Sequence, residues 1–155
     1  MARIAPAELP DDLPVKNSLV EATYNNPEIH RGFASLSGRV HSASRLSARI
    51  RELVVLRVAA MLGSDFQWTQ HAPTARREGV SEAQLGALRS GDLAAFEGAD
   101  RAAVAFAEAV EARRVDDTAW AAARAHFTEG ELSDMAMLAG FYGLACRYVL
   151  ALDIK

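Results

Sequence analysis

The sequence predicts an all-α fold with about seven helices. Apolar residues recur at three- and four-residue spacing through most of the chain, which is the period of a helix. No segment alternates apolar and polar residues over the length of a strand, and hairpin dipeptides are nearly absent. A chain of 155 residues suits one domain, which we place at residues 1–155.

The N-terminal segment differs from the rest of the chain. Pro6, Pro10 and Pro14 all lie within it. Because proline removes a backbone donor and fixes φ, this spacing favours an extended arm over residues 1–15. The helical pattern begins at Pro27, since proline is well suited to the first turn of a helix.

The strongest helix prediction covers residues 46–62. Its apolar residues occupy more than one face, so we expect it to be buried on several sides. Gly63 is placed to end it, and a further helix is predicted over residues 65–78. Ser81 and Gln84 then form the pattern of a capping box, which opens a short helix.

Three more helices are predicted in the C-terminal third. Asp100 is placed to cap the first and Asp116 precedes the second, while Thr128 and Glu131 form a capping box for the last. This last helix, at residues 129–152, is apolar nearly all round. It is therefore either the central helix or part of an interface, and we expect a homo-oligomer.

Composition excludes several classes of protein. A formal net charge of -3 and a pI near 5.8 leave no basic stripe for nucleic acid. The longest late uncharged stretch, residues 135–146, has about 12 residues, short of the roughly 20 of a membrane span. The N-terminus shows no secretory signal, and a single cysteine, Cys146, excludes an internal disulfide. We therefore expect a soluble, cytoplasmic protein with a small-molecule substrate and no nucleic-acid or membrane partner.

Glu52 and His71 are the candidate catalytic residues. Glu52 lies within the most apolar helix, where a carboxylate is costly unless it is paired or protonated. It could simply pair with Arg49, nearly one turn back. His71 lies two residues before Pro73, which frees a backbone carbonyl and could open a polar pocket through a kink. The alternative is an ordinary structural histidine.

Candidate substrate-binding residues surround this pair. Ser64, Gln67 and Trp68 share a helix face with His71, although Ser64 and Gln67 also form a capping box and Trp68 suits a core or pocket wall. On the last helix, Tyr142 and Arg147 could supply a donor and an anion partner. Arg147 interrupts an apolar run, so it must pair with Glu52, a neighbouring subunit or a ligand carboxylate.

No metal site is predicted. His30 and His41 lie eleven residues apart on one helix, or roughly 16 Å, too far to share a metal ion. Closer histidine pairs with ligand spacing are absent from the sequence. Cys146 is interpreted as a small buried residue, and His126 suits the end of a helix.

Several stretches resemble a known superfamily. They are R-E-L-x-x-L-R-V, aromatic-x-W-x-x-H, A-R-x-x-G-V and GFYGLACRYVLALDI. Over residues 14–154 the chain is similar to the carboxymuconolactone decarboxylase and alkyl hydroperoxidase D (AhpD) superfamily. The resemblance implies an AhpD-like helical bundle and, with the apolar last helix, a trimer or a hexamer.

The resemblance also bears on the chemistry. Glu52 matches the glutamate that helps activate the thiols of the peroxidase branch, and His71 matches the histidine of its proton relay. Ser64 and Gln67 occupy the two cysteine positions, so thiol peroxidase activity is not expected. The decarboxylase branch lacks these cysteines and keeps the histidine, but it often carries an acidic residue at the position of Gln67.

The sequence thus favours a cofactor-free acid–base enzyme that acts on a small lactone or carboxylated substrate, and the resemblance implies that the enzyme is of the lyase type. The reaction would be a decarboxylation, or a proton-transfer isomerisation or elimination. The alternative is a non-catalytic oligomeric protein that binds a small ligand.

Overall fold

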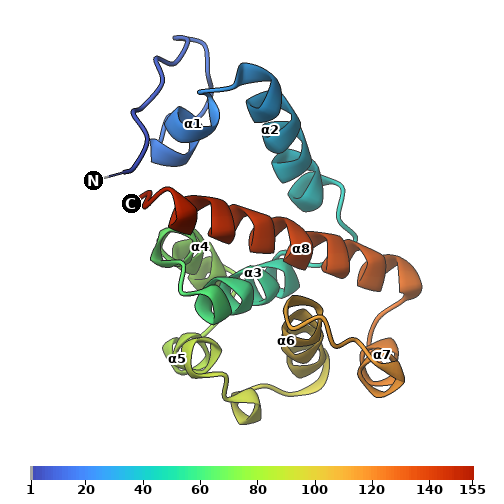
Figure 1. The fold of residues 1–155 in the computed structure, drawn as a ribbon. Coiled ribbons are helices and arrows are strands. Elements are labelled where there is room, and N and C mark those ends of the chain that lie inside the picture. The colour runs from blue at the N-terminus through green and yellow to red at the C-terminus, as the bar shows by residue number, and fades with distance from the viewer. Residues whose placement is uncertain (1) are drawn as a thin grey trace.

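The computed structural model describes residues 2–155, and within them the fold is all-α, as predicted (Figure 1). The described part has eight α-helices and one short 3-10 helix, η1. Their bounds are α1 Ser18–Thr23, α2 Pro27–Ser42, α3 Ala48–Leu62, α4 Asp65–Arg77, α5 Glu82–Ser90, η1 Leu93–Ala95, α6 Gly98–Glu111, α7 Asp117–Arg124 and α8 Glu129–Ala151.

Local sequence signals set several helix ends. The predicted capping boxes at the starts of α5 and α8 are both present. Gly63 ends α3 in the left-handed region, at φ 70°, a conformation that costs glycine little. The box predicted at Ser64 is only half formed. Ser64 accepts from the Gln67 backbone N–H at 3.4 Å, but its own N–H donates to the Ala59 carbonyl.

One predicted helix start was wrong. Asp100 does not cap α6, which begins at Gly98, because its carboxylate bonds Arg49 instead. The helix predicted over residues 65–78 is α4, which runs through Pro73 to Arg77, as predicted. The six-residue α1 and the three-residue η1 were not predicted, because such short segments hold too few apolar positions to show a period.

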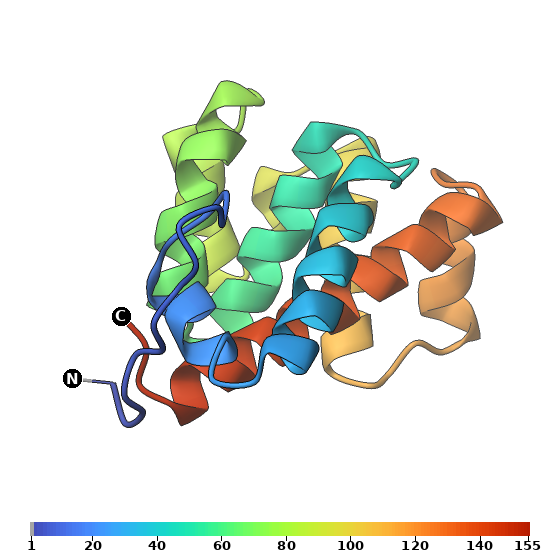
Figure 2. The same cartoon turned by 90° about the horizontal axis from the view of Figure 1, so that it is seen from above.

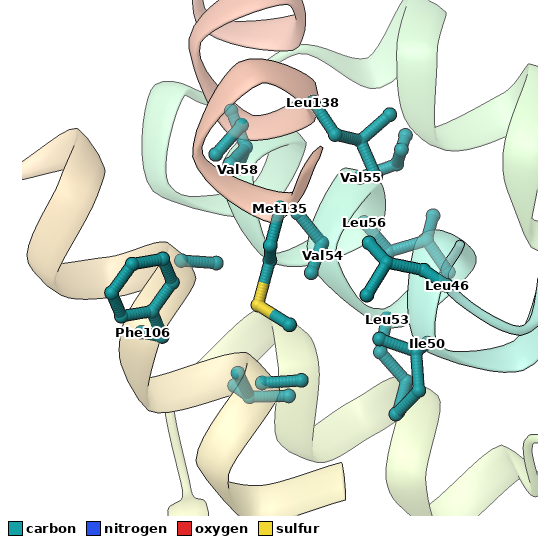
Figure 3. Packing of buried hydrophobic residues seen from close by; sticks show 14 of the residues in the cluster. Leu46, Ile50, Leu53, Val54, Val55, Leu56, Val58, Phe106, Met135 and Leu138 are labelled. Carbon is teal, nitrogen blue, oxygen red and sulfur yellow. The ribbon is translucent and has the colours of Figure 1, made fainter. Parts of the chain in front are cut away.

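Helices α3 and α8 form the centre of the molecule (Figure 1). Helix α3 packs against α4, α5, α6 and α8. Figure 3 shows this packing, in which Met135 of α8 points between Phe106 of α6 and Val54 of α3. All three side chains are buried. The prediction that residues 46–62 are buried on several sides is confirmed.

Helices α1 and α2 lie on the opposite side of α8 from α5, α6 and α7 (Figures 1 and 2). Helix α2 contacts α8 through Phe33 and Phe141, whose ring centroids are 5.1 Å apart. Before α1, described residues 2–17 form no helix, and the Arg3 N–H donates to the Leu152 carbonyl at 2.8 Å. No helix within residues 2–155 is long and apolar enough to cross a membrane. This packing places one side chain from each of α2, α3, α4 and α8 at a common point.

Candidate functional site

Four polar side chains meet where α2, α3, α4 and α8 come together. Glu52 is supplied by α3, His71 by α4, Tyr142 by α8 and His41 by α2. The turn at Gly63 folds α4 back along α3, so residues on both sides of the turn face one another. Glu52 lies eleven residues before Gly63 and His71 eight after it, about 16 Å and about 12 Å along the two axes.

Glu52 and His71 form a buried hydrogen-bonded pair. The distance from His71 Nδ1 to Glu52 Oε2 is 2.9 Å, with 6% of the Glu52 side chain and 16% of the His71 side chain exposed. Arg49 is not the partner of Glu52, because it bonds Asp100 on α6. If Nδ1 carries the proton toward the carboxylate, Nε2 of His71 keeps its lone pair for a reacting group.

Tyr142 and His41 extend this cluster. The Tyr142 hydroxyl lies 2.7 Å from His41 Nε2, and the Tyr142 ring stands edge-on to His71 with centroids 4.9 Å apart. The His41 and His71 rings are stacked at 6.0 Å. Burial, with the nearby Glu52 charge, raises the pKa of Tyr142 above its ordinary value, so the phenol keeps its proton and can donate to His41.

The pKa of His41 is lowered, first by burial and then by His71 and Arg51, while Glu52 opposes the shift. Protonation of His41 therefore favours the unfolded state. The stability that neutral His41 contributes is present above about pH 6.5, the ordinary pKa, and is lost as the pH falls through the lower folded-state value.

We expect the urea midpoint of the wild type to fall on acidification below about pH 6.5. His41→Gln should show a smaller fall, because glutamine does not titrate. His126→Gln, which changes an exposed histidine, is the control and should follow the wild type. Equal acid sensitivity of His41→Gln and the wild type would exclude His41 as its source.

Ser64 and Gln67 are both buried at the start of α4. The Ser64 side chain lies near the Cys146 thiol of α8, which no sequence pattern indicated. Cys146 is fully buried, and burial raises the pKa of its thiol to about 11, although the neighbouring Ser64 hydroxyl opposes that shift. The thiol therefore stays protonated near neutral pH and is a poor nucleophile.

A thiol-specific disulfide reagent should label Cys146 slowly in the folded protein and rapidly in denaturant, because access and thiolate formation both require unfolding. The measurement is the labelling rate with and without denaturant at a fixed mildly alkaline pH. Rapid labelling of the folded protein would contradict the assignment of Cys146 as an inert buried residue.

Two predicted binding residues lie away from the cluster. The Trp68 ring stacks under the Arg89 guanidinium at 4.0 Å, toward α5. Arg147 pairs with Glu111 on α6 and not with Glu52, and its side chain is 58% exposed. The structure therefore brings together Glu52, His71 and Tyr142, but it places neither Trp68 nor Arg147 against them.

His41 was missed by the sequence analysis, which considered it only as a metal ligand. The available signal was its position directly after the apolar Val40, in the helical pattern that begins at Pro27. Within residues 2–155, no group of three or more histidine, cysteine, aspartate or glutamate side chains could hold a metal ion.

A cavity of about 540 Å³ lies at the N-terminal end of α4. Ser64, Phe66 and Gln70 line it from one side, and Val149 and Leu150 of α8 line it from the other. Glu52, His71 and Tyr142 are not among its lining residues. The polar cluster and this cavity are thus separate features that both touch α4.

Comparison with known proteins settles the family. The model of the carboxymuconolactone decarboxylase family matches residues 27–109, which is more than half of the chain. The chain belongs to this family. The match includes α2, α3 and α4, and so Glu52, His71 and His41. A search of curated proteins found no match.

Solved structures of AhpD-like proteins share the fold of this family member. A putative antioxidant defence protein AhpD from Agrobacterium tumefaciens superposes with a TM-score of 0.80 at 22% identity, covering 90% of this chain and 97% of its own. A peroxidase-related protein from Ralstonia eutropha gives 0.85 at 20% identity, with 99% and 91% covered. The debrominase Bmp8 gives 0.77 at 17% identity, with 90% and 76% covered. At these identities the likeness establishes the fold alone.

Proposed function

We propose that this protein is a cofactor-free acid–base enzyme of the carboxymuconolactone decarboxylase family that acts on a small lactone or carboxylated substrate. The observation that carries the proposal is the buried 2.9 Å hydrogen bond between His71 Nδ1 and Glu52. It orients the imidazole and fixes which ring nitrogen faces the carboxylate. Tyr142 packs edge-on against the same ring and restricts its orientation.

For a decarboxylation, the bond to the carboxylate carbon breaks and its electron pair moves into the adjacent carbonyl or lactone system. Carbon dioxide leaves, and protonated His71 gives a proton to the carbon through Nε2. A proton from solvent then restores the imidazolium beside Glu52. For an isomerisation, neutral His71 takes a proton from one carbon and returns it to another. For an elimination, His71 takes the proton, the electron pair of the broken C–H bond forms a double bond as the leaving group departs, and His71 then gives the proton to the leaving group.

The test is turnover of a panel of lactones and β-keto acids across a pH series by the wild type, His71→Gln and Glu52→Gln. The proposal expects at least one panel member to be converted by the wild type and much more slowly by both variants. Failure of the wild type to convert any member would reject the enzymatic proposal. Equal rates in all three proteins would reject the assigned residues.

A second candidate is a non-catalytic protein that binds a small ligand, and the cavity of about 540 Å³ beside Ser64 favours it. Its expected result is tight binding of a panel member without turnover. Thiol peroxidase activity is not proposed, because the only cysteine is the buried Cys146. Hydroperoxide reduction that survives Cys146→Ser would overturn that judgement.

We also propose that the protein is a homo-oligomer, a trimer or a hexamer, assembled through apolar helices. Met137, Leu144 and Leu150 support this, because they are large apolar side chains of α8 that are between 45% and 57% exposed. Light scattering after size-exclusion chromatography tests the proposal. A monomer at micromolar concentration would reject it.

A further inference from the structure

Helix α3 carries three half-buried arginines, and one of them differs from the other two. Arg49 bonds Asp100 at 2.7 Å and Arg57 bonds Glu108 at 2.6 Å, so both charges are neutralised by carboxylates of α6. Arg51 lies about 200° around the helix from Arg49, on the side away from α6. No carboxylate within residues 2–155 forms a salt bridge with Arg51.

The guanidinium of Arg51 is only partly satisfied. Its Nη1 donates to the Leu46 carbonyl at 2.5 Å, which fixes one end of the group. Its Nε is buried and has no hydrogen-bond acceptor among the described residues. A buried N–H without an acceptor is costly, and a charged one more so. The unsatisfied Nε belongs to the edge that, with Nη2, can bind both oxygens of a carboxylate.

Arg51 also lies beside the polar cluster. It is the residue before Glu52 on α3, and its charge acts on His41, which stacks on His71. The Glu52 carboxylate cannot serve as its full partner, because Glu52 Oε2 is engaged by His71. Arg51 thus brings to this cluster a positive charge that no salt bridge neutralises among the described residues.

From the unpaired guanidinium edge and its place beside His41 and Glu52, we infer that Arg51 binds a carboxylate group of the substrate and selects for organic carboxylate anions. This inference rests on the proposed function and assigns to Arg51 the anion-binding role that the sequence suggested for Arg147. In a decarboxylation, the anchored carboxylate is one that the reaction retains. An arginine that neutralised the departing group would hold back the loss of carbon dioxide.

The test compares paraconate, a lactone with one carboxylate, with its methyl ester, using calorimetric titration of the full chain. We expect the wild type to bind the acid at least about tenfold more tightly than the ester, since a charge-assisted fork is lost in the ester. Arg51→Gln should bind both alike. Arg51→Lys, which keeps the charge but lacks the fork, should show a reduced preference.

Arg101→Gln is the matched control, because it removes one exposed positive charge from α6 and leaves the cluster intact. It should keep the preference of the wild type. Circular dichroism and thermal melting check that each variant is folded. If Arg51→Gln does not fold, the Arg51→Lys comparison decides the question.

A second readout separates binding from a structural role. The groups that face His41 are His71, Glu52, Arg51 and Tyr142. Neutralisation of Arg51 by bound paraconate should raise the pKa of His41 in nuclear magnetic resonance titrations of the wild type, and paraconate should leave that pKa unchanged in Arg51→Gln. No rise in the wild type would contradict the inference.

Failure of this inference is distinguishable from failure of the proposed function. Suppose that the wild type binds paraconate more tightly than its ester, that Arg51→Gln abolishes this difference, and that no panel member is turned over. This result would support the anion site and reject the enzymatic proposal. The opposite result is turnover that depends on His71, together with an Arg51→Gln variant that still prefers paraconate to its ester. It would support the enzymatic proposal and reject the anion site. Absence of paraconate binding, or no preference for it over the ester in the wild type, also overturns the inference.

Discussion

Replacing His71 by glutamine is expected to lower kcat by about 100-fold to 10,000-fold, the range in which a positioned proton-transfer group contributes. The glutamine amide can still donate a hydrogen bond to Glu52, so the buried carboxylate keeps a partner. It cannot exchange a proton near neutral pH. The measurement is kcat for whichever panel substrate the wild type converts.

His126→Gln provides the comparison for this substitution, because it removes an exposed histidine outside the cluster. Its kcat should equal that of the wild type. If the kcat of His71→Gln stays within about twofold of the wild-type value, another group moves the proton.

The largest expected effect on stability comes from the core between α3 and its neighbours. Leu53→Ala should lower the free energy of unfolding by about 2–5 kcal/mol, because a fully buried leucine leaves a cavity when it is truncated. Figure 3 shows Leu53 beside Ile50 on α3, within the packed cluster. Urea denaturation followed by circular dichroism measures the change.

Ile29→Ala removes a similar volume from a side chain that is 64% exposed on α2. Its effect should stay within about 0.5 kcal/mol. If Leu53→Ala lowers the free energy of unfolding by no more than Ile29→Ala does, α3 is not the centre of the core.

The sequence predicted the features that depend on neighbouring residues. The capping boxes at Ser81 and Thr128 and the helix end at Gly63 are local, because each is decided within a few residues. The burial of α3 followed from its apolar residues on several faces. Glu52 and His71 were named as candidate catalytic residues from their sequence positions and from the family resemblance, but the hydrogen bond between them was not predicted.

Features that depend on packing between distant helices could not be predicted. Asp100 has the sequence context of a cap, but Arg49 competes for its carboxylate once α3 and α6 pack together. His41 joins the cluster only because Phe33 and Phe141 hold α2 against α8. The pairing of Arg147 with Glu111 likewise requires the contact between α6 and α8, which leaves Arg51 as the uncompensated charge near Glu52.

The central claim is that Glu52 and His71 work as one proton-transfer unit, and a double-mutant cycle on kcat tests it most directly. If the claim is right, Glu52→Gln lowers kcat, and the double variant with His71→Gln is no slower than His71→Gln alone, to within about threefold. Losses that multiply in the double variant would show that the two residues act independently and would contradict the claim.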